Sequence, residues 1–398
     1  MSWTPSKLVP RSAPAVLLIL TFAAAAAFAA VSHLVTRFNA NQQARARKLY
    51  TQGIAQVNAS HYADAIDAFR AALVCDPNNS QYQLSLARAL RDSGNPRHLD
   101  EAESYLTALW QRNPEDGTIN LALGRVAARR ANLDDAIRYY HNAIYGIWAS
   151  DADSYRRKAR LELIDFLLQQ NARGQAESEL IALATFLPTD PAGHLQAAQL
   201  FARAQDYSNA LSQYEEVLRL DRENNQGNSA AFAGAGDAAF REGHYRTAEH
   251  YLREAITANP QDQDTRQLLD RATLILAADP FVHRISDAER NRRISVAFTK
   301  AGERLTGCTQ SKGADLTQPT PLSNASSVPN SLPSLASRWT AMKPELRRMR
   351  SPADTDLPDT IMDLVFQIEQ QAAIECGDPQ GTDLALLLIS RDREAADR

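Results

Sequence analysis

Residues 229–262 read SAAFAGAGDAAFREGHYRTAEHYLREAITANPQD, and this stretch decides the fold. Small residues follow Phe232 at the third, fourth and seventh positions, which is the spacing of one face of an α-helix. A second stripe of small and apolar residues is formed by Ala248, Leu252 and Ala255. Pro260 ends this second helix because proline has no N–H to donate in a helix interior. Short side chains on both stripes allow two helices to approach closely, so the stretch predicts a helical hairpin.

The hairpin resembles one unit of the tetratricopeptide repeat. The 34-residue unit of that family carries a Leu-Gly pair and a Tyr in its first helix, and Ala, an aromatic or aliphatic residue and Pro in its second. Here Ala235-Gly236 stands in place of Leu-Gly, and Ala239 stands in place of Tyr. The resemblance implies an all-α fold in which stacked hairpins curl into a right-handed superhelix. The first helix of each hairpin then lines a concave groove.

The pattern recurs six times along the chain. The small residue of the second helix is found at Ala65, Ala102, Ala136, Ala176, Ala210 and Ala248. A Phe, Leu or Tyr lies four residues after each of them, and a Pro lies twelve residues after four of the six. Average proline usage of about 5% would place roughly 0.3 prolines there by chance. We therefore expect six repeats within residues 45–262, at about 46–79, 80–116, 117–150, 157–190, 191–224 and 229–262.

An apolar segment precedes the repeats. Residues 1–12 form a basic flank with Lys7 and Arg11, and no Lys, Arg, Asp or Glu follows before Arg37. Residues 13–36 exceed the about 20 residues needed to cross a bilayer core, so we expect one transmembrane helix. A cleaved signal sequence is the competing interpretation, because the alanine-rich end around residues 27–30 offers small-residue cleavage sites. A buried helix of a soluble protein is the third.

The charges around this segment point in both directions. Lys7 and Arg11 precede it, whereas Arg45, Arg47 and Lys48 follow it, so the positive-inside rule does not settle the orientation. We expect the amino terminus inside and the repeats outside the cytoplasm, because the basic flank resembles that of a signal sequence.

The resemblance also implies which side chains face the groove. These are Tyr50, Arg88, Arg91, Arg125, Arg129, Arg203 and Arg241. Guanidinium groups one repeat apart match the oxygen pairs of carboxylates, so we expect a protein or peptide partner with an acidic segment. The alternative is that these arginines are solvated or pair with Asp92, Asp165 and Asp237.

No catalytic, cofactor or metal site is predicted. No two histidines have the i, i+4 spacing of a helical metal site, and no Cys-x-x-Cys is present. The Gly234-Ala235-Gly236 run has no third glycine and no preceding strand, which argues against a phosphate-binding loop. A net charge of −4 argues against nucleic-acid binding. We therefore expect a protein that is not an enzyme.

Residues 263–278 are expected to form a helix that caps the last hairpin, and residues 285–308 a further helix. Residues 309–334 are rich in Ser and Pro, which is typical of a linker. Residues 335–398 predict a small helical segment whose first helix is interrupted by Pro344. Cys308 and Cys376 either form a disulfide, as an extracytoplasmic location would allow, or remain free thiols.

Together these features predict a membrane-anchored scaffold for protein–protein interactions, with a role in cell-envelope or complex assembly. One alternative is a secreted soluble repeat protein after signal cleavage. Another is a docking arm for a ligand-binding or enzymatic unit at the carboxyl terminus.

Overall fold

The computed structural model describes residues 13–223, 228–282, 284–311, 331–348 and 356–396. These residues form 17 helices and no strand, so the all-α fold predicted from the sequence is confirmed. The chain divides into two compact units, Met1–Glu179 and Leu180–Arg398, and each is described by itself.

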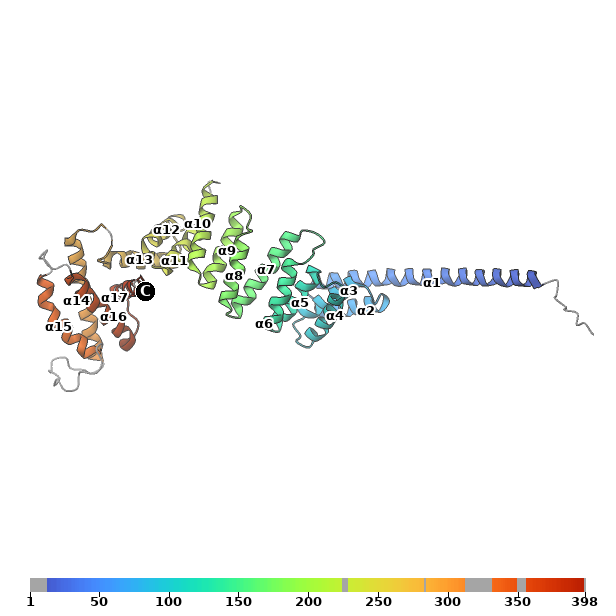
Figure 1. Ribbon diagram of the computed structural model, residues 1–398, viewed down its shortest axis with the longest axis horizontal. Helices are drawn as coiled ribbons and strands as arrows, with labels where there is room; N and C mark the ends of the chain where they lie inside the picture. The colour runs from blue at the N-terminus through green and yellow to red at the C-terminus, as the bar shows by residue number, and fades with distance from the viewer. Residues whose placement is uncertain (1–12, 224–227, 283, 312–330, 349–355, 397–398) are drawn as a thin grey trace, which may run out of the picture. The chain divides into compact units, whose positions relative to one another are not determined.

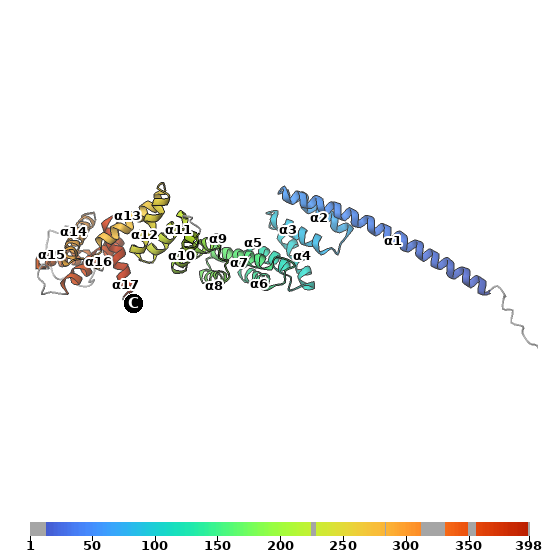
Figure 2. The same ribbon diagram turned by 90° about the horizontal axis from the view of Figure 1, so that it is seen from above.

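The first unit begins with the 46-residue helix α1 (Ala13–Asn58). Its amino-terminal half extends beyond the neighbouring helices of this unit, as Figure 1 and Figure 2 show. The apolar side chains of that half, among them Phe22, Phe28 and Leu34, are exposed. Between Leu17 and Asn58, α1 is long and apolar enough to cross a membrane.

The apolar segment and the first helix of the first repeat are one continuous helix. The sequence predicted two separate elements, an apolar segment at residues 13–36 and a repeat that begins at about residue 46. The structure differs because the chain has no glycine or proline between Pro14 and Gly53, so nothing ends the helix.

The remaining helices of the first unit form antiparallel pairs. They are α2 (Tyr62–Cys75), α3 (Ser80–Asp92), α4 (His98–Arg112), α5 (Gly117–Arg129), α6 (Leu133–Tyr145), α7 (Ala152–Gln169) and α8 (Arg173–Ala184), whose last residues belong to the second unit. Helix α1 packs on α2, α3 on α4 and α5 on α6. The small residues Ala65, Ala102 and Ala136 are fully buried in these contacts. A Cβ at Gly124 of α5 would lie 3.2 Å from the ring of Tyr140 on α6, so a larger residue there would push the two helices apart.

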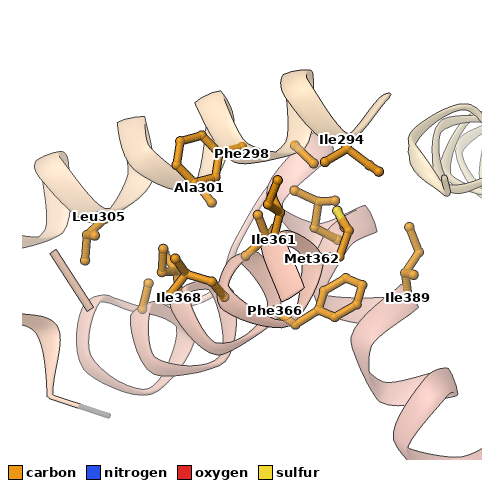
Figure 3. Packing of buried hydrophobic residues seen from close by; sticks show 14 of the residues in the cluster. Ile294, Phe298, Ala301, Leu305, Ile361, Met362, Phe366, Ile368 and Ile389 are labelled. Carbon is orange, nitrogen blue, oxygen red and sulfur yellow. The ribbon is translucent and has the colours of Figure 1, made fainter. Parts of the chain in front are cut away.

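The second unit continues the hairpins and adds a carboxyl-terminal bundle. The hairpin helices are α9 (Pro191–Ala204), α10 (Tyr207–Glu223), α11 (Ser229–Arg241), α12 (Tyr245–Ala258) and α13 (Gln263–Ala278). The bundle consists of α14 (Asp287–Ser311), α15 (Leu332–Arg348), α16 (Leu357–Cys376) and α17 (Thr382–Ala396). Figure 3 shows Phe298 of α14, Phe366 of α16 and Ile389 of α17 in its common core.

The bundle packs on the last hairpin rather than standing apart from it. Phe240, Tyr245 and Leu274 of the hairpin helices pack against the bundle core. The guanidinium carbon of Arg393 in α17 lies 3.8 Å from the ring centroid of Phe281. The bundle therefore covers apolar surface at the end of the repeats.

Two details of the bundle differ from the sequence expectations. Helices α14 and α15 extend into residues 309–334, the expected linker, and the part from 312 to 330 lies outside the described residues. Pro344 does not interrupt α15, which continues to Arg348. Proline at this position removes only the hydrogen bond to the carbonyl of the exposed Thr340, which water can replace.

A disulfide and a buried ionic cluster join α14 to α16. Cys308 and Cys376 are bonded, with their Cα atoms 5.7 Å apart. One helical turn before Cys308, Arg304 lies with its Nε 3.3 Å from a carboxylate oxygen of Glu369. Burial, reinforced by the charge of Asp383 and opposed by Arg304, raises the pKa of Glu369 to about 8.

This buried carboxyl makes the stability of the bundle pH-dependent. The folded state holds the Glu369 proton more tightly than the unfolded chain, where the pKa is near the ordinary value of 4.5. The contribution of protonated Glu369 to the free energy of unfolding is therefore full below about pH 4.5 and is lost as pH rises through about 8. We expect Glu369→Gln to flatten the decline of the unfolding midpoint between pH 5 and pH 8, measured by urea denaturation. The exposed Glu303, changed to Gln, is the matched control, and equal pH profiles for wild type and Glu369→Gln would contradict the expectation.

Candidate partner-binding groove

A cavity of about 330 Å³ lies in the first unit between the carboxyl-terminal ends of α3 and α5 and the carboxyl-terminal half of α7. Its walls carry both signs of charge. The lining residues are Arg91, Asp92, Arg125, Ala128, Arg129, Tyr140, Glu162, Asp165, Phe166 and Gln169. We call this cavity the repeat groove.

Local helix chemistry places these side chains. The Asn79 side chain accepts from the Tyr82 N–H at the start of α3, and Asp116 accepts from the N–H groups of Thr118 and Ile119 at the start of α5. These caps fix where each helix begins and therefore which residues share a face. Arg125 and Arg129 lie one turn apart at the carboxyl-terminal end of α5, where the helix dipole favours positive charge.

Two arginines of the repeat groove are paired with carboxylates. Arg125 donates from Nε and Nη2 to the two oxygens of Glu162, at 2.7 and 2.6 Å, and so links α5 to α7. Burial lowers the pKa of Arg125, but the hydrogen bonds and charge of Glu162 outweigh it and leave the pKa raised. Arg91 donates to the neighbouring Asp92 in the same two-pronged manner, at 2.8 and 2.7 Å.

Other donor groups have no acceptor. The Nη1 of Arg91 and the Nε of Arg88 are buried without a hydrogen-bond partner. Burial, with the nearby charges of Arg91 and Arg125, lowers the pKa of Arg88. Within the described part of the chain, neither Arg88 nor Arg129 forms an ion pair. A buried guanidinium nitrogen without an acceptor is costly. Arg91 lines the groove, whereas Arg88 is not among the lining residues and lies beside them.

The remaining sequence-predicted site residues lie elsewhere. The ring of Tyr50 stacks on Tyr82 with centroids 4.7 Å apart, and its hydroxyl lies 3.3 Å from the Ser85 hydroxyl. Tyr50 thus ties α1 to α3. Arg203 on α9 and Arg241 on α11 belong to the second unit, where Arg241 pairs with Asp237 at 3.4 Å.

The sequence reasoning missed Glu162 and Tyr140. Burial, with the charge of Glu162, raises the pKa of Tyr140, which also hydrogen-bonds that carboxylate. The signal that could have found Glu162 is its separation of 37 residues from Arg125, about one repeat. Residues one repeat apart lie on equivalent helices, so opposite charges at this spacing are candidates for pairing.

Comparison with known protein families decides the class of the chain. The family model described as "Cytochrome c-type biogenesis protein H TPR domain" matches residues 34–154, and a tetratricopeptide repeat model matches residues 195–263. The chain is a tetratricopeptide repeat protein. A comparison with curated proteins finds no match.

Two solved structures show a partial likeness to this chain. One, from a study of Pseudomonas aeruginosa PilF, is 15% identical, covers 57% of this chain and 97% of its own, and has a TM-score of 0.38. Another, the type IV pilus biogenesis factor PilW, is 17% identical, covers 56% of this chain and 98% of its own, and has a TM-score of 0.38. At these values the likenesses say nothing about what this repeat protein binds.

The groove of this repeat protein is suited to binding. In the described ranges, no group of three or more His, Cys, Asp or Glu residues is placed to hold a metal ion. The polar groups that line the groove are guanidinium, carboxylate, amide and phenol. Such a set donates and accepts hydrogen bonds to a peptide. The tetratricopeptide repeats of the chain support a protein-interaction scaffold.

The Arg125–Glu162 pair should stabilise the hairpin stack. Its side chains are 24% and 28% exposed, so removing one partner leaves a partly buried charge. We expect Arg125→Ala to lower the free energy of unfolding by about 1–3 kcal/mol. Adding Glu162→Gln should then cost less than it does in wild type, as a double-mutant cycle in urea denaturation measures.

The same cycle on the more exposed pair Arg219–Glu216 is the control and should give a coupling below about 1 kcal/mol. Equal couplings for the two pairs would contradict the expectation.

Proposed function

We propose that this tetratricopeptide repeat protein is a membrane-anchored scaffold that holds a protein partner outside the cytoplasm during the assembly of a cell-envelope complex. The observation that carries the proposal is α1, which runs without a break from an apolar span into the first hairpin. The family model that matches residues 34–154 is named for cytochrome c-type biogenesis. This match supports cytochrome c biogenesis as the assembly process in which the scaffold acts.

The continuous helix gives the anchor a mechanical role. About 20 apolar residues span a bilayer core, and the uncharged part of α1 ends before Arg37. From there to the buried Ala46 the helix rises roughly 14 Å. A helix without a flexible joint would hold the first hairpin close to the membrane surface. The proposed partner is therefore bound where membrane-bound or newly exported proteins pass.

The disulfide supports an extracytoplasmic location for the hairpins and the carboxyl-terminal bundle. Disulfides persist in oxidising compartments and are rare in the cytoplasm, where thiols are kept reduced. With α1 as the single span, the hairpins and the carboxyl-terminal bundle share one side. A bond between Cys308 and Cys376 therefore favours the extracytoplasmic side for both.

Thiol labelling in cells tests this placement. We expect protein purified under alkylating conditions to carry one alkyl group, on Cys75, and three groups after reduction. We also expect protease added to spheroplasts to digest the repeats. Protected repeats, or three alkyl groups without reductant, would contradict the extracytoplasmic placement. Amino-terminal sequencing distinguishes a retained anchor from a secreted protein after signal cleavage.

The repeat groove supports an acidic partner segment. Arg125 and Arg91 are already paired with Glu162 and Asp92, so Arg129 is the lining arginine without an ion pair among the described residues, and Arg88 lies beside the lining. A carboxylate of the partner would pair with Arg129 and gain from the neighbouring positive charge of Arg88.

We expect the double variant Arg88→Ala, Arg129→Ala to reduce partner capture about 10-fold or more, because charge-assisted hydrogen bonds contribute about 1.5–3 kcal/mol each. The measurement is quantitative mass spectrometry of proteins crosslinked to the full-length chain in living cells. Arg138→Ala on α6 is the control, since this arginine is exposed and pairs within its own helix with Asp135. A captured set that is the same for all three chains would rule out the groove as the binding surface.

A further inference from the structure

A second cavity lies in the second unit, where the last hairpin helix meets the carboxyl-terminal bundle. Its volume is about 330 Å³. One wall is α13, the other is α17, and the turn between α16 and α17 closes one end. Helix α17 packs directly on α13, so the cavity is a widening of that helix contact.

The lining is mostly apolar, with one cation, Arg271, and one amide, Gln380. Leu274 of α13 and Leu384 and Leu388 of α17 are half-buried, so their side chains remain accessible from the cavity. Arg271 stands one turn before Leu274 on the same face of α13 and is exposed. No ion pair or hydrogen bond of the Arg271 side chain is found within the described residues. The cavity thus offers an aliphatic floor beside an uncompensated positive charge.

The closing turn is held in place by three contacts. The disulfide from Cys308 fixes Cys376 immediately before it. Arg304 donates to the carbonyl of Gly377 at 2.7 Å. Pro379 is itself buried. A wall fixed in this way need not be ordered when a ligand arrives, so little conformational entropy opposes binding.

We propose that this cavity is a second docking site, for a peptide segment of a partner protein that presents an aliphatic side chain next to a carboxylate. The aliphatic group covers the leucines that the helix contact leaves half-exposed, and the carboxylate pairs with Arg271 through the two-pronged geometry of guanidinium. The site extends the proposed scaffold function, but it uses the carboxyl-terminal bundle and shares no residue with the repeat groove.

A pair of small probes tests this chemistry without a known partner. N-acetyl-leucine carries the aliphatic group and the carboxylate, whereas N-acetyl-leucinamide carries the aliphatic group alone. The full chain in phospholipid nanodiscs, with labelled leucine methyl groups, is titrated with each probe by NMR. We expect N-acetyl-leucine to bind in the millimolar range and to shift the methyl signals of Leu274, Leu384 and Leu388. The amide should bind at least about 5-fold more weakly.

Variants connect the binding to the site. Arg271→Gln should abolish the preference for the acid over the amide, while Arg246→Gln, at an exposed arginine on α12, should retain it. Arg88→Ala, Arg129→Ala should leave the titration unchanged, so loss of partner capture by the repeat groove and failure of this site are separate results. Equal affinity for acid and amide in wild type, or shifts confined to other leucines, would overturn the proposal.

Discussion

The close approach of paired helices is the constraint on which the rest of the structure depends. Fully buried alanines such as Ala65, Ala102 and Ala248 lie where the second helix of a hairpin meets its partner. Gly236 serves the same contact from the first helix, because a Cβ there would lie 2.6 Å from the Leu252 side chain. Protein interiors are close-packed, so an added methyl group at such a point must move a helix. The spacing between helices, and with it the geometry of the repeat groove, follows from these small residues.

Charge then distinguishes one part of the groove from another. The bidentate pair of Arg125 and Glu162 neutralises two groups between α5 and α7, while Arg88 is held beside Arg91 and Arg125 without an acceptor of its own. Burial makes this arrangement energetically demanding, since a desolvated cation gains little from a distant countercharge. Arg88 is not among the residues that line the groove, so its charge acts on the groove from beside Arg91.

The carboxyl-terminal bundle is fixed by contacts of a different kind. Residues Ile361, Met362 and Ile368 pack into one core with α14 and α17, and a disulfide ties the ends of α14 and α16. Its contact with Phe240 and Tyr245 covers surface that a further hairpin would otherwise cover. A tail packed in this way also creates new surface, and the cavity between α13 and α17 is one result.

The sequence by itself determined the repeat class, the all-α fold and the apolar amino-terminal span, because each depends on local periodicity or on composition. Of the seven residues that the sequence predicted to face the groove, Arg91, Arg125 and Arg129 line the cavity. The tertiary structure decided which of them are paired. The partner of Arg125 is 37 residues away, and the stagger of neighbouring helices brings Glu162 rather than Asp165 within 2.7 Å of it. The continuity of α1 follows from a stretch without glycine or proline between Pro14 and Gly53, so it could be read from the sequence. Only the three-dimensional arrangement packs the bundle against α13, because that contact is the sum of many apolar contacts and has no short motif in the sequence.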